Sequence, residues 1–274
     1  RFRPPAARAL RVAAFVLTPF AIAGALLFLF RWALPRFVDV VASRIPVAWE
    51  QQLGSAVVNN LAPPDKRCAN PATAAAMKAI LDRLTAAAPP TPYRYVVYVI
   101  PEGTPNAFAA PGGAIVFTVG LLELTTGPEE VAGVMAHEIQ HVIQRHGTQS
   151  IVRELSLRAL LRLATGDLGG LGTALKTAGQ IGALRYSRED EAAADRGAIE
   201  LLTAAHVDPR GTVTVLEKMK AHPLARFEPP AYLSTHPALD ERIASLTQLT
   251  AGSAPTIPPL LSGASWSRIT TCAP

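Results

Sequence analysis

The sequence has few of the features that indicate a nucleic-acid-binding protein or a repeat protein. Its 274 residues carry a net charge of +5, yet no block of lysine and arginine is interleaved with aromatic residues. Part of the excess base flanks an apolar run, where anionic lipid head groups are the natural partner. No segment repeats along the chain. We therefore expect no nucleic-acid partner and a single folded domain beside a membrane.

Cysteine is also scarce. Cys68 and Cys272 are the two in the chain, and they lie near the start and the end of the expected folded domain. A disulfide between them would tie these ends together, which requires an oxidising compartment. Two unpaired thiols are the alternative. We predict the disulfide, and with it a domain outside the cytoplasm.

The longest uncharged apolar run is VAAFVLTPFAIAGALLFLF, residues 12–30. As a helix rising about 1.5 Å per residue, it nearly spans the ~30 Å hydrocarbon core of a bilayer. A cleavable signal peptide is the alternative, but RWALPRF follows where a small-residue cleavage site would lie. The flanking arginines slightly favour a cytoplasmic N-terminus. We predict an N-terminal basic segment and single-pass anchor over 1–34 in a bacterial inner membrane, with the domain 35–274 facing the periplasm.

The rest of the chain predicts helices around one small sheet, an α+β, mostly helical fold preceded by one transmembrane helix. Strand patterns cover residues 93–101 and 114–120. Helical patterns cover 36–54 with a break at Pro46, 72–88, a helix opened by Pro128 and closed by Gly147, 148–164, a helix from the capping box at Ser187 to about Ala205, a helix from Asp208, and one from His236 to about Leu249.

Histidine is also scarce, and its distribution is uneven. Three of the six histidines fall within the stretch VMAHEIQHVIQRHG, residues 134–147. His137 and His141 are four apart, so on a helix both imidazoles lie on one face and can bind one metal ion. Glu138 flanks them, close enough to reach a bound water but not the metal. The stretch therefore supplies half of a zinc site and a candidate catalytic base.

A third zinc ligand must come from elsewhere. A metzincin would have glycine at position 144 and histidine at 147, where this chain has Gln144 and Gly147. On a continuous helix His146 faces away from His141, so we interpret it as a helix-end residue near the negative end of the helix dipole.

A glutamate on a second helix is the other solution. In SREDEAAADRG, Glu191 and Asp195 are four apart and share a helix face. Glu191 could reach the zinc, while Asp195 could hydrogen-bond the far nitrogen of His137. A solvated helix face is the alternative interpretation of Glu191.

Together these motifs resemble metallopeptidase family 48, the gluzincins that include the HtpX proteases and the CAAX prenyl proteases. HEIQH followed by YSREDEAAAD matches the family's S-R-x-x-E-x-x-A-D arrangement. NAFAAPGGAIVFTVGLL (106–122) resembles the segment before the zinc helix, and STHPALDERI (234–243) resembles a downstream T-H-P-x-x-x-x-R motif. The resemblance covers about residues 50–250. Ala193 stands where many members have a second glutamate, and the single apolar run resembles a single-span bacterial branch.

The resemblance implies one Zn²⁺ per chain, bound by His137, His141 and Glu191, with a fourth position for water. Zinc lowers the pKa of such a water, and Glu138 would take its proton as it attacks a peptide carbonyl and pass it to the leaving amine. The implied function is a membrane-anchored zinc metalloendopeptidase that cleaves proteins or peptides in envelope quality control. A latent or non-proteolytic membrane-tethered chaperone that keeps a zinc site is the alternative, and no oligomeric state is predicted.

The remaining site residues also follow from the resemblance. His236 would stabilise the oxyanion or gate the metal, and Arg242 would anchor the site through Asp195 or another acid. The strand 114–120 would lie at the edge of the sheet beside the cleft, where Ala114 and Val116 would hold an extended substrate by main-chain hydrogen bonds. Segments 168–184 and 222–236 are candidates to cover the cleft.

Overall fold

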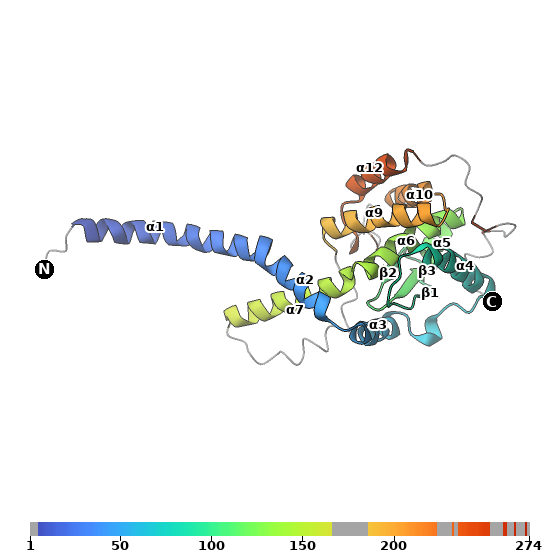
Figure 1. Cartoon of the computed structure of the whole chain (residues 1–274), viewed down its shortest axis with the longest axis horizontal. Helices are drawn as coiled ribbons and strands as arrows, with labels where there is room; N and C mark the ends of the chain where they lie inside the picture. Colours follow the sequence, from blue (N-terminus) through green and yellow to red (C-terminus); the bar gives the residue numbers. More distant parts are fainter. Residues whose placement is uncertain are drawn as a thin grey trace.

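The chain forms a body of helices around a small sheet, from which one long helix projects (Figure 1). The computed structural model describes residues 5–165, 186–223, 232, 235–252, 260, 261, 266 and 272. Within these residues the fold is mostly helical with one small sheet, as the sequence predicts. The segment 168–184 and most of the segment 222–236, the two predicted covers, lie outside the described residues.

The projecting helix contains the predicted anchor. It comprises α1 (Pro5–Phe28), the π-helical turn η1 (Leu29–Ala33) and α2 (Leu34–Arg44). Residues 10–44 form one helix that is long and apolar enough to cross a membrane. Phe15 and Phe20 are 85% and 71% exposed, so they are largely uncovered by the described part of the chain. A run of large apolar side chains left uncovered by protein is the surface that a bilayer would cover.

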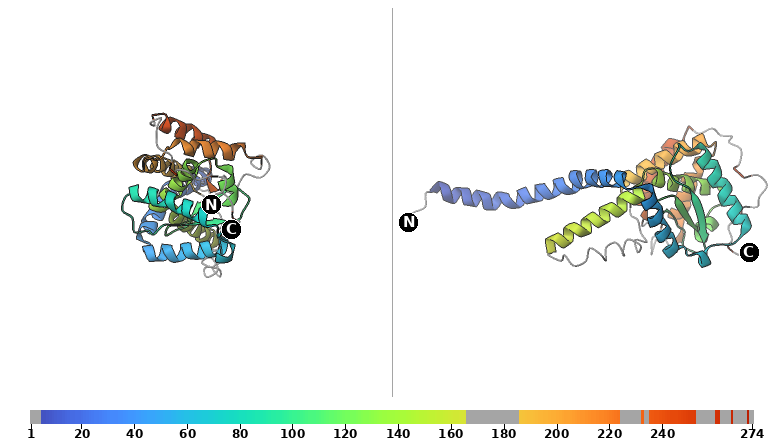
Figure 2. Two further views of the ribbon diagram at one scale, coloured as in Figure 1. Left: turned by 90° about the vertical axis from the view of Figure 1, so that its right-hand side faces the viewer. Right: turned by 60° about the horizontal axis from the view of Figure 1, so that its bottom comes forward.

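The base of this helix joins the body through two neighbours. The buried face of α2, with Val38 and Ala42, lies beside α7 (His146–Thr165), and both helices point in the same general direction away from the body (Figures 1 and 2). The helix breaks at Pro46, as predicted, because a residue before proline is disfavoured in helical conformation. Ile45 is extended, and α3 (Val47–Leu61) starts in a new direction.

The sheet has three strands in the order β1-β3-β2. β1 (Val96–Ile100) pairs parallel with β3 (Ala114–Thr118), and β2 (Ala107–Ala109) pairs antiparallel with the other side of β3. The prediction that β3 is an edge strand is therefore wrong, since β3 is paired on both sides. β2 has only three residues and lies in a segment rich in turn residues, which is why the strand pattern does not reveal it.

Helices cover the sheet and build one main core around α6 (Pro128–Ile143), in which every residue from Glu130 to Val142 is buried. Around α6 and the sheet lie α4 (Pro71–Ala87), α5 (Val119–Leu124), α9 (Arg188–Ala204), α10 (Arg210–Ala221) and α12 (Leu239–Thr250), and the 3-10 turn η2 (Pro64–Lys66) follows α3. Gly133 lets α10 approach closely, because a Cβ there would lie 2.8 Å from the Cα of Thr212. The central helix is thus fixed on several sides.

The end of α6 differs from the prediction that it closes at Gly147. α6 ends at Ile143 and α7 begins at His146. Arg145 makes the turn between them with a φ of 60°, a left-handed conformation that glycine usually supplies. Gly147 lies inside the first turn of α7. A side chain at residue 145 therefore sits at a strained position, which indicates that its neighbours hold it there.

The predicted disulfide is confirmed, because Cys68 and Cys272 are bonded, with their Cα atoms 4.9 Å apart. The bond joins residues 204 apart in the sequence, so it ties the end of the chain to the loop before α4. A disulfide of this kind is typical of a domain in an oxidising compartment.

Candidate metal centre

Two helices bring the predicted ligands together. His137 and His141 lie one turn apart on α6, and Glu191 lies in the first turn of α9. The predicted capping box fixes the start of α9: Ser187 Oγ accepts from the Asp190 N–H at 3.1 Å, and Asp190 Oδ2 accepts from the Ser187 N–H at 2.9 Å. This start positions the carboxylate of Glu191 against α6.

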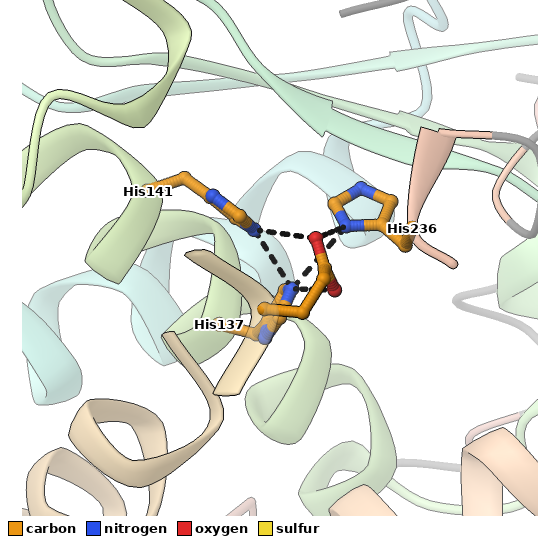
Figure 3. Close-up of side chains that lie close together, drawn as sticks. His137, His141 and His236 are labelled. Carbon is orange, nitrogen blue, oxygen red and sulfur yellow. Dashed lines mark hydrogen bonds and ion pairs between the residues drawn. The ribbon is translucent and has the colours of Figure 1, made fainter. Parts of the chain in front are cut away.

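The side chains of His137, His141, Glu191 and His236 each direct one polar atom to a common point, and these atoms lie within 4.8 Å of one another (Figure 3). The Nε2 atoms of His137 and His141 are 2.9 Å apart. Glu191 Oε2 is 3.5 Å from His137 Nε2, and Glu191 Oε1 is 3.5 Å from His141 Nε2. All four residues are at most 1% exposed.

This donor set fits a zinc ion. Imidazole nitrogens and a carboxylate oxygen are the ligands of catalytic zinc sites, which use three protein ligands and an open position. Beside them Glu138 is fully buried, and neither of its carboxylate oxygens makes a hydrogen bond in the described part of the chain, although Nε2 of His236 lies 3.6 Å from one of them. A buried carboxylate without a hydrogen bond is costly. A metal with its water would supply the missing donor.

His137 is held by charged neighbours. Its Nδ1 lies 2.9 Å from Asp195 Oδ1, the contact expected from the sequence, so Nε2 faces the common point. Arg242 binds Asp195 through two nitrogens, each at 2.8 Å, and Glu191 Oε2 through a third, also at 2.8 Å. Arg242 thus anchors two acids of the site.

These contacts shift the pKa values of His137, Asp195 and Glu191. Burial and Arg242 lower the pKa of His137, but Asp195 and Glu191 outweigh them and raise it to about 9. Burial raises the pKa of Asp195, but the charge and hydrogen bond of Arg242 prevail and lower it to about 2. Burial opposes the ionised form of Glu191 as well, and the charges of His236 and Arg242 hold its pKa well below the usual range. Both acids are therefore ionised at neutral pH.

On the side away from Glu191, His141 is held by two aromatic rings. Its Nδ1 lies 2.9 Å from Nδ1 of His146, and Tyr186 stacks on its ring with the centroids 3.9 Å apart. The expectation that His146 faces away from His141 is wrong, because it assumes a continuous helix. The turn at Arg145 brings His146 back against the far nitrogen of His141. Burial lowers the pKa of both His141 and His146.

Glu138 lies between the ligands and the sheet. Burial raises its pKa, while the positive charges of His236 and His137 and the backbone of Ala109 on β2 lower it less strongly. A buried carboxylate with a raised pKa beside a candidate metal site is the kind of group that general bases are drawn from.

His236 lies inside the cluster of ligands. Its Nδ1 is 2.9 Å from Glu191 Oε1 and 3.4 Å from His137 Nε2, while its Nε2 is 3.6 Å from Glu138 Oε1. Tyr232, which the sequence reasoning does not identify, stacks on the ring of His236 at 4.2 Å between centroids. A tyrosine four residues before the histidine is the one signal that could have indicated it.

Ala114 and Val116, the predicted substrate-binding residues, belong to the central strand rather than to an edge strand. Val116 is fully buried in a second apolar cluster with Val57 and Val58 of α3. Their strand pairs with β1 on one side and β2 on the other. The edge placement is therefore wrong, and their role in binding substrate stays a prediction without that support.

Comparison with known proteins gives one consistent family. Residues 71–250 match peptidase family M48. The mitochondrial metalloendopeptidase OMA1 of Schizosaccharomyces pombe is 33% identical over 172 residues, covering 62% of this chain and 50% of that protein. The beta-barrel assembly-enhancing protease of Escherichia coli strain K12 is 28% identical over 224 residues, covering 77% of this chain and 46% of that protein. The chain thus spans about half the length of these relatives.

Proposed function

Because the chain belongs to peptidase family M48, we propose that it is a zinc metalloendopeptidase of the bacterial envelope. In this proposal residues 12–30 anchor it in the inner membrane, and residues 35–274 form the peptidase domain in the periplasm. The disulfide between Cys68 and Cys272 supports that side of the membrane. The observation that carries the proposal is the buried cluster of candidate ligands beside the carboxylate of Glu138, whose oxygens make no hydrogen bond in the described part of the chain.

His137, His141 and Glu191 would hold one zinc ion per chain. When bound, zinc polarises a substrate carbonyl and lowers the pKa of a water. Glu138 takes the proton of the attacking water and passes it to the leaving amine. Asp195 keeps His137 in the tautomer with its Nδ1 protonated, so that Nε2 can bind the metal. Arg242 keeps both acids ionised and in place.

The free edge of β2, rather than β3, is the proposed place for an extended substrate. The backbone of residues 106 and 110, on either side of β2, bonds to β3 at 3.0 and 2.7 Å. Backbone groups alternate in direction along a strand, so those of Ala107 and Ala109 point away from β3. The backbone of Ala109 interacts with the carboxylate of Glu138. A peptide paired with this edge would therefore run past the proposed base.

The described conformation corresponds to a closed state in this proposal. Glu138 and His236 are fully buried, and Ala107 and Ala109 at the edge of β2 are at most 2% exposed. His236 places a ring nitrogen where a substrate or water would complete the metal site. Substrate entry then requires His236 and Tyr232 to move, which makes a regulated, latent peptidase the form of the proposal that the geometry favours over an always-open one.

The test is proteolysis of unfolded casein by the zinc-loaded, membrane-reconstituted chain and two variants. Glu138→Gln keeps the size of the side chain but removes the base, so we expect zinc to remain bound and cleavage to fall by about 10²–10⁴-fold. His236→Ala opens the fourth position, so we expect faster cleavage than in the wild type.

Equal cleavage by the wild type and Glu138→Gln would contradict the role of Glu138. Firm zinc binding without cleavage by either the wild type or His236→Ala would favour the alternative of a membrane-tethered chaperone or binding protein. A loss of cleavage in His236→Ala with zinc retained would instead make His236 an oxyanion donor.

A further inference from the structure

A second buried polar cluster lies beside the metal centre and takes no part in the proposed mechanism. At its middle is Glu50 of α3, which is 1% exposed. Its carboxylate accepts hydrogen bonds from Tyr93 Oη at 2.8 Å, from Arg145 Nε at 3.0 Å and from the hydroxyl of Thr148. Burying a carboxylate this deeply is costly unless such partners bind it. The cluster is therefore a built feature of the fold.

Arg145 connects this cluster to the base of the membrane helix. Its terminal nitrogens donate to the backbone oxygen of Ile45 at 2.5 Å and approach that of Ser43 at 3.4 Å. These are carbonyls at the C-terminal end of α2, where a helix leaves backbone acceptors without partners. Glu50 lies in the first turn of α3, the next helix along the chain. One guanidinium thus joins both helices that follow the anchor.

The backbone of Arg145 connects the same cluster to the metal centre. Its φ of 60° makes the turn that starts α7 at His146. His146 Nδ1 is then 2.9 Å from His141 Nδ1, which leaves Nε2 of His141 facing the other ligands. Thr148, in the same turn of α7, is tied to Glu50. The orientation of the His141 ring consequently depends on the strained turn at Arg145. Glu50 holds this turn through its hydrogen bonds with Arg145 and Thr148.

α3 also contacts the other wall of the site. A Cβ on Gly112, in the turn between β2 and β3, would lie 2.6 Å from the Cα of Gln51. A Cβ on Gly54 would lie 1.8 Å from the backbone oxygen of Pro111. Glu50, Arg145, His141 and this turn line one small cavity of about 10 Å³. α3 therefore packs directly against the turn that joins β2 to β3, and Glu50 and His141 line the same cavity.

We infer that Glu50 and Arg145 are positioning residues that orient His141 for metal binding and couple the metal centre to the helices next to the membrane. The inference rests on the proposed metal site. It assigns the pair no contact with substrate or metal: Glu50 fixes Arg145, Arg145 fixes the turn, and the turn places His146 against His141. A metal site set in this way loses affinity when the membrane-proximal contact is removed.

The experiment measures Co²⁺ and Zn²⁺ affinity of the full chain in lipid nanodiscs, together with the visible absorption of bound Co²⁺, which reports ligand geometry. Glu50→Gln removes the charge that holds Arg145. Arg145→Gly removes the side chain but keeps a residue that adopts a positive φ without strain. We expect each variant to weaken metal binding by about 10-fold or more and to change the Co²⁺ spectrum.

Glu130→Gln is the matched control. Glu130 is a buried carboxylate at the other end of the metal helix, paired with Lys218 at 2.8 Å. We expect this variant to lower the unfolding midpoint without changing metal affinity or spectrum. The double variant of Glu50 and Arg145 should bind metal about as tightly as whichever single variant binds it less tightly. The two losses do not add, since both residues act through one turn.

Wild-type affinity and spectrum in both Glu50→Gln and Arg145→Gly would overturn the inference, even with a lowered unfolding midpoint. An equal loss of affinity in Glu130→Gln would also overturn it, by showing a general effect of stability. A wild-type chain that binds neither ion would instead refute the metal site itself, and with it the proposed function.

Discussion

His137 and His141 occupy neighbouring turns of one helix, yet different kinds of neighbour hold them. His137 contacts the ionised Asp195, to which Arg242 donates hydrogen bonds from two nitrogens. His141 is bound by the ring of His146 and stacked on Tyr186, with no charged group on its far nitrogen. The first contact sets the charge of the site, whereas the second depends on where the chain turns.

The two sides also differ in what lies behind them. Behind His137 are α9 and α12, which belong to the same helical body as α6. Behind His141 are the turn at Arg145, between α6 and α7, and the start of α3. α3 is the next helix along the chain after the one that projects from the body (Figure 1). One candidate ligand is therefore secured by electrostatics inside the helical body, and the other by the junction with the projecting helix.

The largest expected effect comes from breaking the charged side. Arg242→Leu leaves the buried carboxylates of Asp195 and Glu191 without their cation, so we expect the metal-free protein to lose about 3–5 kcal/mol of stability. Arg188→Leu is the matched control, because Arg188 joins the same two helices through an exposed pair with Glu241 at 2.7 Å. That pair should contribute at most ~1 kcal/mol.

Urea unfolding of the metal-free chain in detergent measures both values. Equal losses from the two arginine variants would mean that burial of the Arg242 pair adds nothing to stability. Such a result would contradict the claim that electrostatic contacts secure the His137 side of the site.

A smaller effect concerns the pH dependence of metal binding. The pKa of His137 is about 9 in the metal-free site, and a ligand histidine must be neutral. Below that pH a proton leaves as the metal enters, so apparent Zn²⁺ affinity should rise with pH by up to about tenfold per unit. In Asp195→Asn a carboxylate that raises this pKa is lost, so the rise in affinity should level off at a lower pH than in the wild type.

Competition with a coloured chelator between pH 6.5 and 9 measures this dependence. The same slope in the wild type and Asp195→Asn would show that Asp195 does not set the protonation of His137. His146→Gln, on the uncharged side, should leave the slope unchanged while weakening binding at every pH.

The ligand spacing and the helix starts could be predicted from the sequence because they depend on local contacts. His137 and His141 need only the periodicity of a helix, and Ser187 caps the helix that carries Glu191 within one turn. Pro46 breaks the membrane-proximal helix for an equally local reason. Such features do not depend on which distant segments pack together.

The errors arise where distant or unusual contacts decide the structure. The sequence predicts a continuous helix through His146, since nothing in its neighbourhood indicates that Arg145 adopts a left-handed turn held by Glu50, 95 residues earlier. It also predicts β3 at the edge of the sheet, since the three residues of β2 are too few to form a pattern. In both cases pairing across the fold overrides what the local sequence favours.

The most direct test of the central claim is to locate the metal by X-ray diffraction from zinc-soaked crystals, recorded on both sides of the zinc absorption edge. The account predicts one anomalous peak per chain, within about 2.0–2.2 Å of His137 Nε2, His141 Nε2 and a carboxylate oxygen of Glu191. A site without a peak, or a peak that Glu191 does not contact, would contradict it.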